Sequence, residues 1–291
     1  MHIFAIETHK IYPANPLNMK LKTLLVSTAL AIASVCSANA VVTTIADVSD
    51  NFNRTVGNQT SASSPNALNT EDVQYQIVRG TWADTGSYIT GAANPSPTSP
   101  SIMYATNVQT QSTGNFDFAL SVDILNVNSS SNPGDRMGGI VFNLQDSSNY
   151  YLLRTGNKNS ALPVAETYFE FAKVVNGTLT VLDHQTRTGL TSQWYTISIS
   201  SSLTLDNTFT YSFSDQIGGT LRYSNTVTDE TFSNGYAGFW DIAGGGGGGR
   251  FDNFSLTVLQ TVPEPSTVAL FGVGMVGVLF LRNRARSRSV S

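Results

Sequence analysis

The chain has 291 residues and a formal net charge of −4, and only 12% of its residues are charged. Its 16 Lys and Arg residues against 20 Asp and Glu residues do not provide the clustered basic charge that phosphate binding needs, which disfavours nucleic acid as a partner. The single cysteine excludes a disulfide framework.

An export signal lies near the amino terminus. Lys20 and Lys22 form its charged part, and residues 24–33 form its apolar part. Ala38 and Ala40 are the small residues of a small-x-small cleavage site. This order of segments predicts export by the Sec machinery.

Residues 19–40 are therefore predicted to be a signal peptide that begins at Met19. Residues 1–18 show no clear pattern, and we interpret them as a non-native extension. The alternative is an unusually long charged region at the start of the signal. Because Cys36 lies inside the signal, the mature chain is expected to have no thiol.

The mature body is expected to span residues 41–261. It holds two lysines and seven arginines against 18 acids, so its net charge is 9 − 18 = −9. This charge permits divalent cations as ligands. The body is otherwise rich in Ser, Thr, Asn and Gly, which are typical of turns and exposed strand faces.

Apolar and polar residues alternate with a period of two through the body. Residues 116–124, 195–199 and 209–213 show this alternation most clearly, which predicts half-buried strands. Further strands are expected at residues 75–82, 102–105, 139–144, 150–154, 168–174, 178–182, 221–225, 236–240 and 251–258, and loops at 55–70, 91–101 and 244–249. Asn176-Gly177 lies between two of these strands and predicts a tight hairpin turn. Many short strands without a helical period predict an all-β sandwich or barrel.

Several short motifs in the body resemble strands of concanavalin A-like lectin/glucanase (LamG-like) sandwiches. They lie at residues 50–52, 138–142, 149–154, 194–197, 235–239 and 251–254. The resemblance implies a jelly-roll β-sandwich. Because this fold hosts lectins, glycosidases and purely structural domains, the resemblance implies no single activity.

The acidic motif of the glucanases with this fold, E-x-D-x-E or E-x-D-x-x-E, is absent from the body. Glu166 and Glu170 share one strand face, but positions four apart on a strand are about 13 Å apart, which is too far for a glycosidase pair. Glu170 is expected on a solvated face, and His184 is expected in an exposed turn. We therefore expect no catalytic residue and no enzymatic activity.

Calcium is the metal that the resemblance implies, bound where the first and last strands meet. Asp50, Asp252 and Asn253 offer the hard oxygen ligands that Ca²⁺ prefers, and both triplets read Asp-Asn-Phe. The alternative is that these side chains bond to nearby backbone amides. No other cofactor is expected.

Sugar binding would use aromatic side chains on an exposed face or loop. Trp240, beside the glycine run 244–249, and Tyr151 are the candidates. The alternative is that such strand aromatics fill the core of the sandwich.

The last thirty residues, 262–291, carry three pieces in a fixed order. A Pro-containing motif is followed by an uncharged apolar run at residues 267–281 and a basic tail at 282–291. The motif is Val262, Pro263, Glu264 and Pro265, and the tail contains Arg282, Arg284, Arg286 and Arg288. Fifteen helical residues span about 22 Å, which is short of a ~30 Å hydrocarbon core, so the run is predicted to span a bilayer marginally. The arginines that follow it are expected to stay cytoplasmic.

This order of motif, span and tail resembles the PEP-CTERM sorting signal. Exosortases recognise that signal in Gram-negative bacteria that make extracellular polysaccharide. The alternative is a plain single-span anchor with a Pro-containing stalk.

Together these features predict a non-enzymatic surface or extracellular-matrix protein associated with exopolysaccharide. The chain would cross the inner membrane, be anchored there transiently, and be processed by an exosortase. The alternative is a carbohydrate-binding, lectin-like module, and a glycoside hydrolase ranks below both.

Overall fold

The computed structural model describes residues 40–53, 59–62, 73–91, 100–125, 136–158, 166–187, 193–202, 204–216, 219–243 and 249–263. The chain divides into two units, Val42–Thr261 and the two ends Met1–Val41 with Val262–Ser291. Nearly all of the predicted signal peptide, and the apolar run and basic tail, lie outside the described residues. No helix in the described ranges is long and apolar enough to cross a membrane.

The described residues form strands and no helix, which confirms the all-β prediction. The strands are β1 Ala40–Asp50, β2 Gln59–Ala62, β3 Tyr75–Arg79, β4 Trp82–Asp84, β5 Ile89–Gly91, β6 Ser101–Gln111, β7 Phe116–Leu125, β8 Arg136–Asp146, β9 Asn149–Lys158, β10 Glu166–Val175, β11 Thr178–Arg187, β12 Trp194–Ser201, β13 Thr208–Asp215, β14 Leu221–Thr228, β15 Asn234–Ala243 and β16 Arg250–Pro263.

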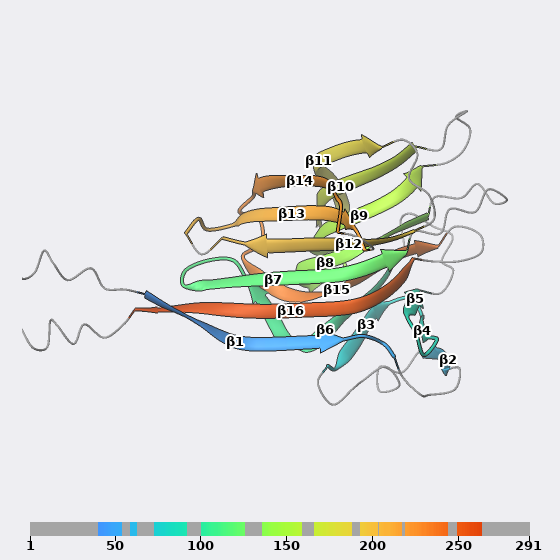
Figure 1. The fold of residues 1–291 in the computed structure, drawn as a ribbon, viewed down its shortest axis with the longest axis horizontal. Helices are drawn as coiled ribbons and strands as arrows, with labels where there is room; N and C mark the ends of the chain where they lie inside the picture. The colour runs from blue at the N-terminus through green and yellow to red at the C-terminus, as the bar shows by residue number, and fades with distance from the viewer. Residues whose placement is uncertain are drawn as a thin grey trace, which may run out of the picture. The chain divides into compact units, whose positions relative to one another are not determined.

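The strands build two sheets that pack face to face as a sandwich (Figure 1). The nine-stranded sheet has the order β14-β13-β12-β7-β16-β5-β4-β2, and β1 also pairs with β16. The seven-stranded sheet has the order β11-β10-β9-β8-β15-β6-β3. Neighbours in the sheets are often distant in the chain, so the sandwich is held together by long-range pairing.

The core between the sheets follows directly from the period-two pattern, because every second side chain of a strand points to the same face. On β12 the residues Tyr195, Ile197 and Ile199 are at most 2% exposed. Phe142 of β8 stacks on Tyr151 of β9 with ring centroids 5.2 Å apart. Aromatic rings from both sheets meet in this core, which adds edge and stacking contacts to the burial of apolar area.

Both Asp-Asn-Phe triplets contribute a core phenylalanine, and each triplet contains one residue with a strained positive φ. Phe52 has φ 47° and Asn253 has φ 52°. These conformations turn the chain so that Phe52 and Phe254 both reach the core, where each packs on Phe239 at centroid distances of 5.9 and 5.2 Å. The two similar triplets therefore close the sandwich at its first and last strands.

The turn between β10 and β11 confirms the hairpin prediction. Asn176 and Gly177 have φ values of 50° and 78°, and Val175 pairs with Thr178 on either side of them. Positive φ at both central residues is the geometry that Asn-Gly favours in two-residue hairpins.

Two expectations about loops were wrong. Residues 55–70 contain the short strand β2, which pairs with β4 at the edge of the nine-stranded sheet. The strand expected to end at Leu182 continues to Arg187, because its outer half still pairs with β10. His184 therefore lies within a strand and not in a turn.

Candidate functional site

Neither predicted sugar-binding aromatic lies open to solvent. Tyr151 is 0% exposed and packs between the sheets against Phe142, Phe171 and Phe209, so its assignment as an exposed platform was wrong. Trp240 is 2% exposed on the outer face of the seven-stranded sheet. Both are large side chains at strand positions where burial gains the most free energy.

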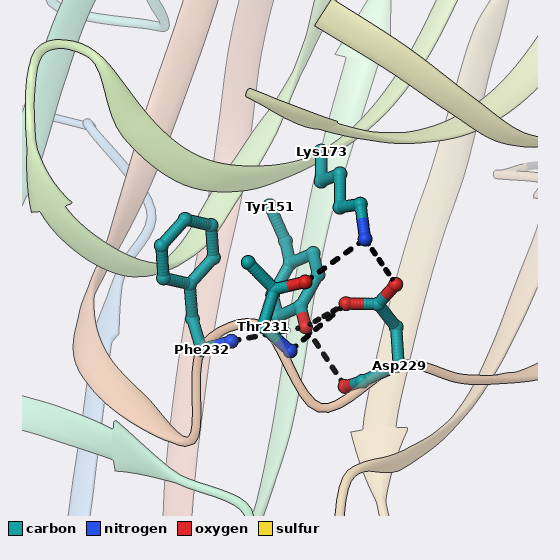
Figure 2. Close-up of polar contacts among 5 residues, drawn as sticks. All are labelled: Tyr151, Lys173, Asp229, Thr231 and Phe232. Carbon is teal, nitrogen blue, oxygen red and sulfur yellow. Dashed lines mark hydrogen bonds and ion pairs between the residues drawn. The ribbon is translucent and has the colours of Figure 1, made fainter. Parts of the chain in front are cut away.

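The hydroxyl of Tyr151 belongs to a polar network that holds the connection between β14 and β15 (Figure 2). It lies 2.6 Å from Oδ1 of Asp229 and accepts a hydrogen bond from the backbone N–H of Phe232 at 3.2 Å. Lys173 donates to Oδ2 of Asp229 at 2.6 Å and to the Thr231 hydroxyl at 2.9 Å. Because β14 and β15 belong to different sheets, this network fixes a crossing point of the sandwich.

The electrostatics of this network are those of a structural clamp. Burial alone would raise the pKa of Asp229, but hydrogen bonds from Lys173, Thr231 and Tyr151 outweigh it and lower the pKa to about 2. Burial and the nearby Asp229 carboxylate raise the pKa of Tyr151. Both groups therefore stay in one protonation state at neutral pH, which does not suit acid–base catalysis.

The outer face of the seven-stranded sheet carries a row of large side chains in register. His184 pairs with Glu170, Glu170 with Arg154, Arg154 with Gly139, and Gly139 with Trp240. Arg154 Nε donates to Glu170 Oε1 at 2.7 Å, and its guanidinium lies over the rings of Tyr168 and Trp240 at 5.8 and 5.4 Å. The expectation of a solvated Glu170 was wrong, because this ion pair leaves the side chain only 6% exposed.

Gly139 leaves room for this arrangement. A Cβ placed at Gly139 would lie 2.3 Å from the Leu153 carbonyl oxygen and 2.8 Å from Arg154 Cβ. The second oxygen of Glu170 lies 3.2 Å from His184 Nδ1, and the His184 ring stacks on Tyr168. These contacts bind the charged groups to one another, so this face is filled by its own side chains.

The predicted calcium ligands are only partly brought together. Asp50 accepts the Phe52 N–H at 2.9 Å and the Tyr75 hydroxyl at 3.1 Å, so both of its oxygens have protein partners. Burial raises the pKa of Asp252, the Asn253 N–H opposes this, and the charges of Asp123 and Asp50 add to it. In the described part of the chain no three His, Cys, Asp or Glu side chains are arranged to hold a metal ion. Calcium binding stays a prediction.

An open groove lies instead on the outer face of the nine-stranded sheet. It has a volume of about 400 Å³. Its lining is Ala119, Leu120, Ser121, Ser198, Ile199, Ser200, Thr210, Tyr211, Ser212, Ser224, Ser255 and Thr257. None of these residues is charged, and most of them expose a hydroxyl group. The groove exists because small side chains occupy the outward positions of β7, β12, β13 and β16.

The groove hydroxyls stand in rows across the strands. The first, which we call the serine row, consists of residues paired directly with one another on neighbouring strands: Ser255, Ser121, Ser198, Ser212 and Ser224. The next row, which we call the threonine row, is Thr257, Ala119, Ser200, Thr210 and Thr226. The two rows together are called the hydroxyl face below.

Most hydroxyls of the serine row have no partner within the described residues. On the hydroxyl face, Thr210 and Thr226 share a side-chain hydrogen bond at 3.1 Å, and Thr257 donates to Asp47 at 3.1 Å. Ser121, Ser198 and Ser212 are half-buried, so their side chains are partly open to solvent. A hydroxyl is both a donor and an acceptor, which leaves this row able to bind a polar ligand.

This site was not predicted from the sequence, although one signal for it was present. Serine and threonine fill the outward positions of residues 195–199 and 209–213, the same segments whose alternation predicted strands. The alternation predicts which residues share one face of a strand, but it does not predict the register between neighbouring strands. Five serines in one row became visible only when the pairing was known.

Comparison with known proteins adds a sorting signal at one end and a fold likeness for the body. No curated protein sequence matches the chain. The chain is similar to the carbohydrate-binding module CBM66 from Bacillus subtilis, with 18% identity, a TM-score of 0.43, and coverage of 64% of this chain and 94% of that one. It is similar to lectin II from Ulex europaeus, with 11% identity, a TM-score of 0.46, and coverage of 74% and 99%. A protein of unknown function from Shewanella oneidensis MR-1 matches with 14% identity, a TM-score of 0.45, and coverage of 87% and 97%.

The carboxyl terminus is the part of the chain that a protein-family model matches. Residues 261–285 match the PEP-CTERM protein-sorting motif, which covers Val262, Pro263, Glu264 and Pro265 and the apolar run that follows them. The last strand of the sandwich, β16, ends at Pro263, inside this match. The chain thus carries a PEP-CTERM protein-sorting motif directly behind an all-β sandwich, and that motif marks it for export and exosortase processing.

Proposed function

We propose that this chain is a non-enzymatic protein of the cell surface or extracellular matrix, retained among exopolysaccharide after an exosortase removes its carboxyl-terminal signal. The observation that supports this most is that the folded body continues up to the sorting motif without a linker. Thr261 still donates a backbone hydrogen bond to Asn115 at 2.7 Å, and the next residue begins the motif.

The positions of the strand ends support processing at both termini. β1 begins at Ala40, the last residue of the predicted signal cleavage site, and β16 ends at Pro263. β1 and β16 run side by side in opposite directions, so the start of one and the end of the other lie at the same end of the sandwich (Figure 1). Cleavage at either end would therefore leave the paired strands of the body intact.

The non-enzymatic part of the proposal rests on how the acidic side chains are used. Glu170 is bound to Arg154 and lies against His184, and Asp229 is bound to Lys173. A carboxylate whose oxygens are bound by neighbouring side chains in this way is not free to contact a sugar. Hydrolysis of polysaccharides by the purified protein would contradict this part alone.

Cell fractionation tests the sorting part. The protein should reach the medium or outer surface in cells that have the exosortase and stay in the inner membrane in cells that lack it. The variant Pro263→Ala with Pro265→Ala should behave like the exosortase deletion, and the control Arg288→Lys should be sorted normally. Recovery of secreted protein that still carries Arg282–Arg288 would overturn the proposal.

A further inference from the structure

We infer that the hydroxyl face of the nine-stranded sheet binds a neutral, extended polysaccharide chain that lies across the strands. The inference rests on the proposed retention among exopolysaccharide, and it adds a site and a class of ligand. The groove of about 400 Å³ defines where the chain would lie.

The spacing of the hydroxyls gives the direction of the ligand. Neighbouring strands in a sheet lie about 4.8 Å apart, so the serine row presents one hydroxyl at each such step. This step is close to the length of one sugar unit in an extended glycan. Along a strand, by contrast, residues of the same face repeat at about 6.7 Å, which matches the sugar repeat less well. A glycan that crosses the strands therefore meets one serine hydroxyl per sugar.

The hydrogen-bonding chemistry of the row is the same as that of a sugar. Each serine hydroxyl donates once and accepts twice, as each sugar hydroxyl does. Ser121, Ser198 and Ser212 are flanked on both sides by paired strands, so their backbones are fixed before any ligand arrives. A fixed row of short side chains loses little conformational entropy on binding, which favours a weak but multivalent contact with a polymer.

The charges around the groove select against acidic polymers. No lining residue is charged. Carboxylates border the two rows, and the guanidinium of Arg222, two residues along β14 from Ser224, is bound to Asp215. Asp47 accepts a hydrogen bond from Thr257 of the threonine row. Asp123 lies on β7 two residues after Ser121. It pairs with Asp252 of β16, which lies at the bulge before Ser255. A polymer of uronic acids would meet like charge at both margins, whereas a neutral glycan would not.

The carboxylates at the margin are held in place by their own partners. Asp123 accepts hydrogen bonds from Thr196 at 2.6 Å, from Gln216 at 2.7 Å and from Asn253 at 2.8 Å. Because these partners satisfy Asp123, the carboxylate is not left to draw a cationic ligand into the groove. The groove is thus lined by uncharged residues and bordered by a carboxylate that its own hydrogen bonds hold in place.

The test uses the full chain purified in detergent and the polysaccharide of the producing cell. Anion exchange separates that material into a neutral and an acidic fraction. In affinity electrophoresis the neutral fraction should retard the protein, and the acidic fraction should retard it at least tenfold less at equal mass. No retardation by the neutral fraction, or equal retardation by both, would overturn the inference.

Two matched variants place the site. Ser198→Glu adds a charge to the centre of the serine row and should weaken binding to the neutral fraction at least tenfold. Thr180→Glu adds the same charge to an exposed position of β11 on the other sheet and should leave binding unchanged. Both variants should keep the melting temperature of the parent within a few degrees. Unchanged binding by a folded Ser198→Glu variant would refute the site.

The outcome separates this inference from the proposed function. If sorting depends on the exosortase but the neutral fraction is not bound, the proposed function stands and the inference fails. If the protein dimerises in size-exclusion chromatography and Ser198→Glu makes it monomeric, the hydroxyl face pairs with a second copy, and the inference also fails.

Discussion

The two sheets of the sandwich carry different kinds of side chain on their outer faces. On the seven-stranded sheet the outward positions hold large side chains such as Trp240, Tyr150 and Tyr168, which form a second buried cluster. On the nine-stranded sheet the outward positions of the central strands hold Ser and Thr, and a groove results. Both sheets bury their inner faces in a shared core.

This difference indicates which outer face of the sandwich can bind a ligand. Arg154 on the filled face is already bound to Glu170 and lies over two aromatic rings. The backbone of Ser198 on the open face is paired within the sheet, but its hydroxyl has no hydrogen-bond partner among the described residues. Polar groups that have no partner within the protein can bind an external ligand. The serines of the open face therefore mark a better candidate site than the charged and aromatic residues of the filled face.

The largest effect on stability is expected at Asp241, a buried carboxyl group on β15. Burial raises the pKa of Asp241 to about 8, although the backbone N–H groups of Gly249 and Gly91 oppose the shift. A folded-state pKa above the unfolded value of about 3.9 means that stability is lost as the pH rises from about 4 to 8, by up to about 5 kcal/mol. Asp241→Asn should remove this loss in melting curves recorded from pH 5 to pH 9.

A wild-type protein whose melting temperature is flat over this pH range would contradict the prediction. Thr180→Ala serves as the control, because Thr180 is exposed and carries no titratable group.

Arg154→Ala should break the filled face. Removing one partner of a buried ion pair leaves Glu170 without the guanidinium that binds it, at an expected cost of about 3–5 kcal/mol. Urea unfolding measures the change. Arg154→Met combined with Glu170→Leu should recover most of the loss, since it removes both charges and keeps the volume. A double variant no more stable than Arg154→Ala would show that the ion pair is not the cause.

Tyr151→Phe tests the clamp between the two sheets. It removes the hydroxyl that contacts Asp229 and Phe232 while keeping the ring, and should lower the free energy of unfolding by about 1–2 kcal/mol. The pKa of Asp229 is lowered to about 2, so its contribution is present above pH 4 and is lost as the pH falls through 4 towards 2. Asp229→Asn should therefore flatten the acid side of the stability profile, and an unchanged acid side would argue against the clamp.

The smallest effect on stability is expected on the open face. Ser121→Ala with Ser198→Ala removes two hydroxyls that have no described partner, so the free energy of unfolding should change by less than about 0.5 kcal/mol. Thermal unfolding measures it. A loss above 1 kcal/mol would show that these hydroxyls serve the fold, which would remove the contrast between the two faces.

Local patterns in the sequence were enough for the elements themselves. Alternation over residues 116–124 predicted β7, and Asn176-Gly177 predicted the hairpin between β10 and β11. The same alternation did not predict whether a large residue faces the core between the sheets or lies on the outer face of its sheet. Tyr151 and Trp240 both looked available, yet one fills the core and the other lies under Arg154.

The sequence by itself determined the all-β class and the sorting motif at residues 261–285, because these depend on composition and on neighbours along the chain. It also predicts a signal peptide at residues 19–40. Only the tertiary structure decided that Glu170 meets Arg154 and that Ser255, Ser121 and Ser198 stand side by side. The register between strands is fixed by how the two sheets pack on each other, and a one-residue shift would send every side chain to the opposite face.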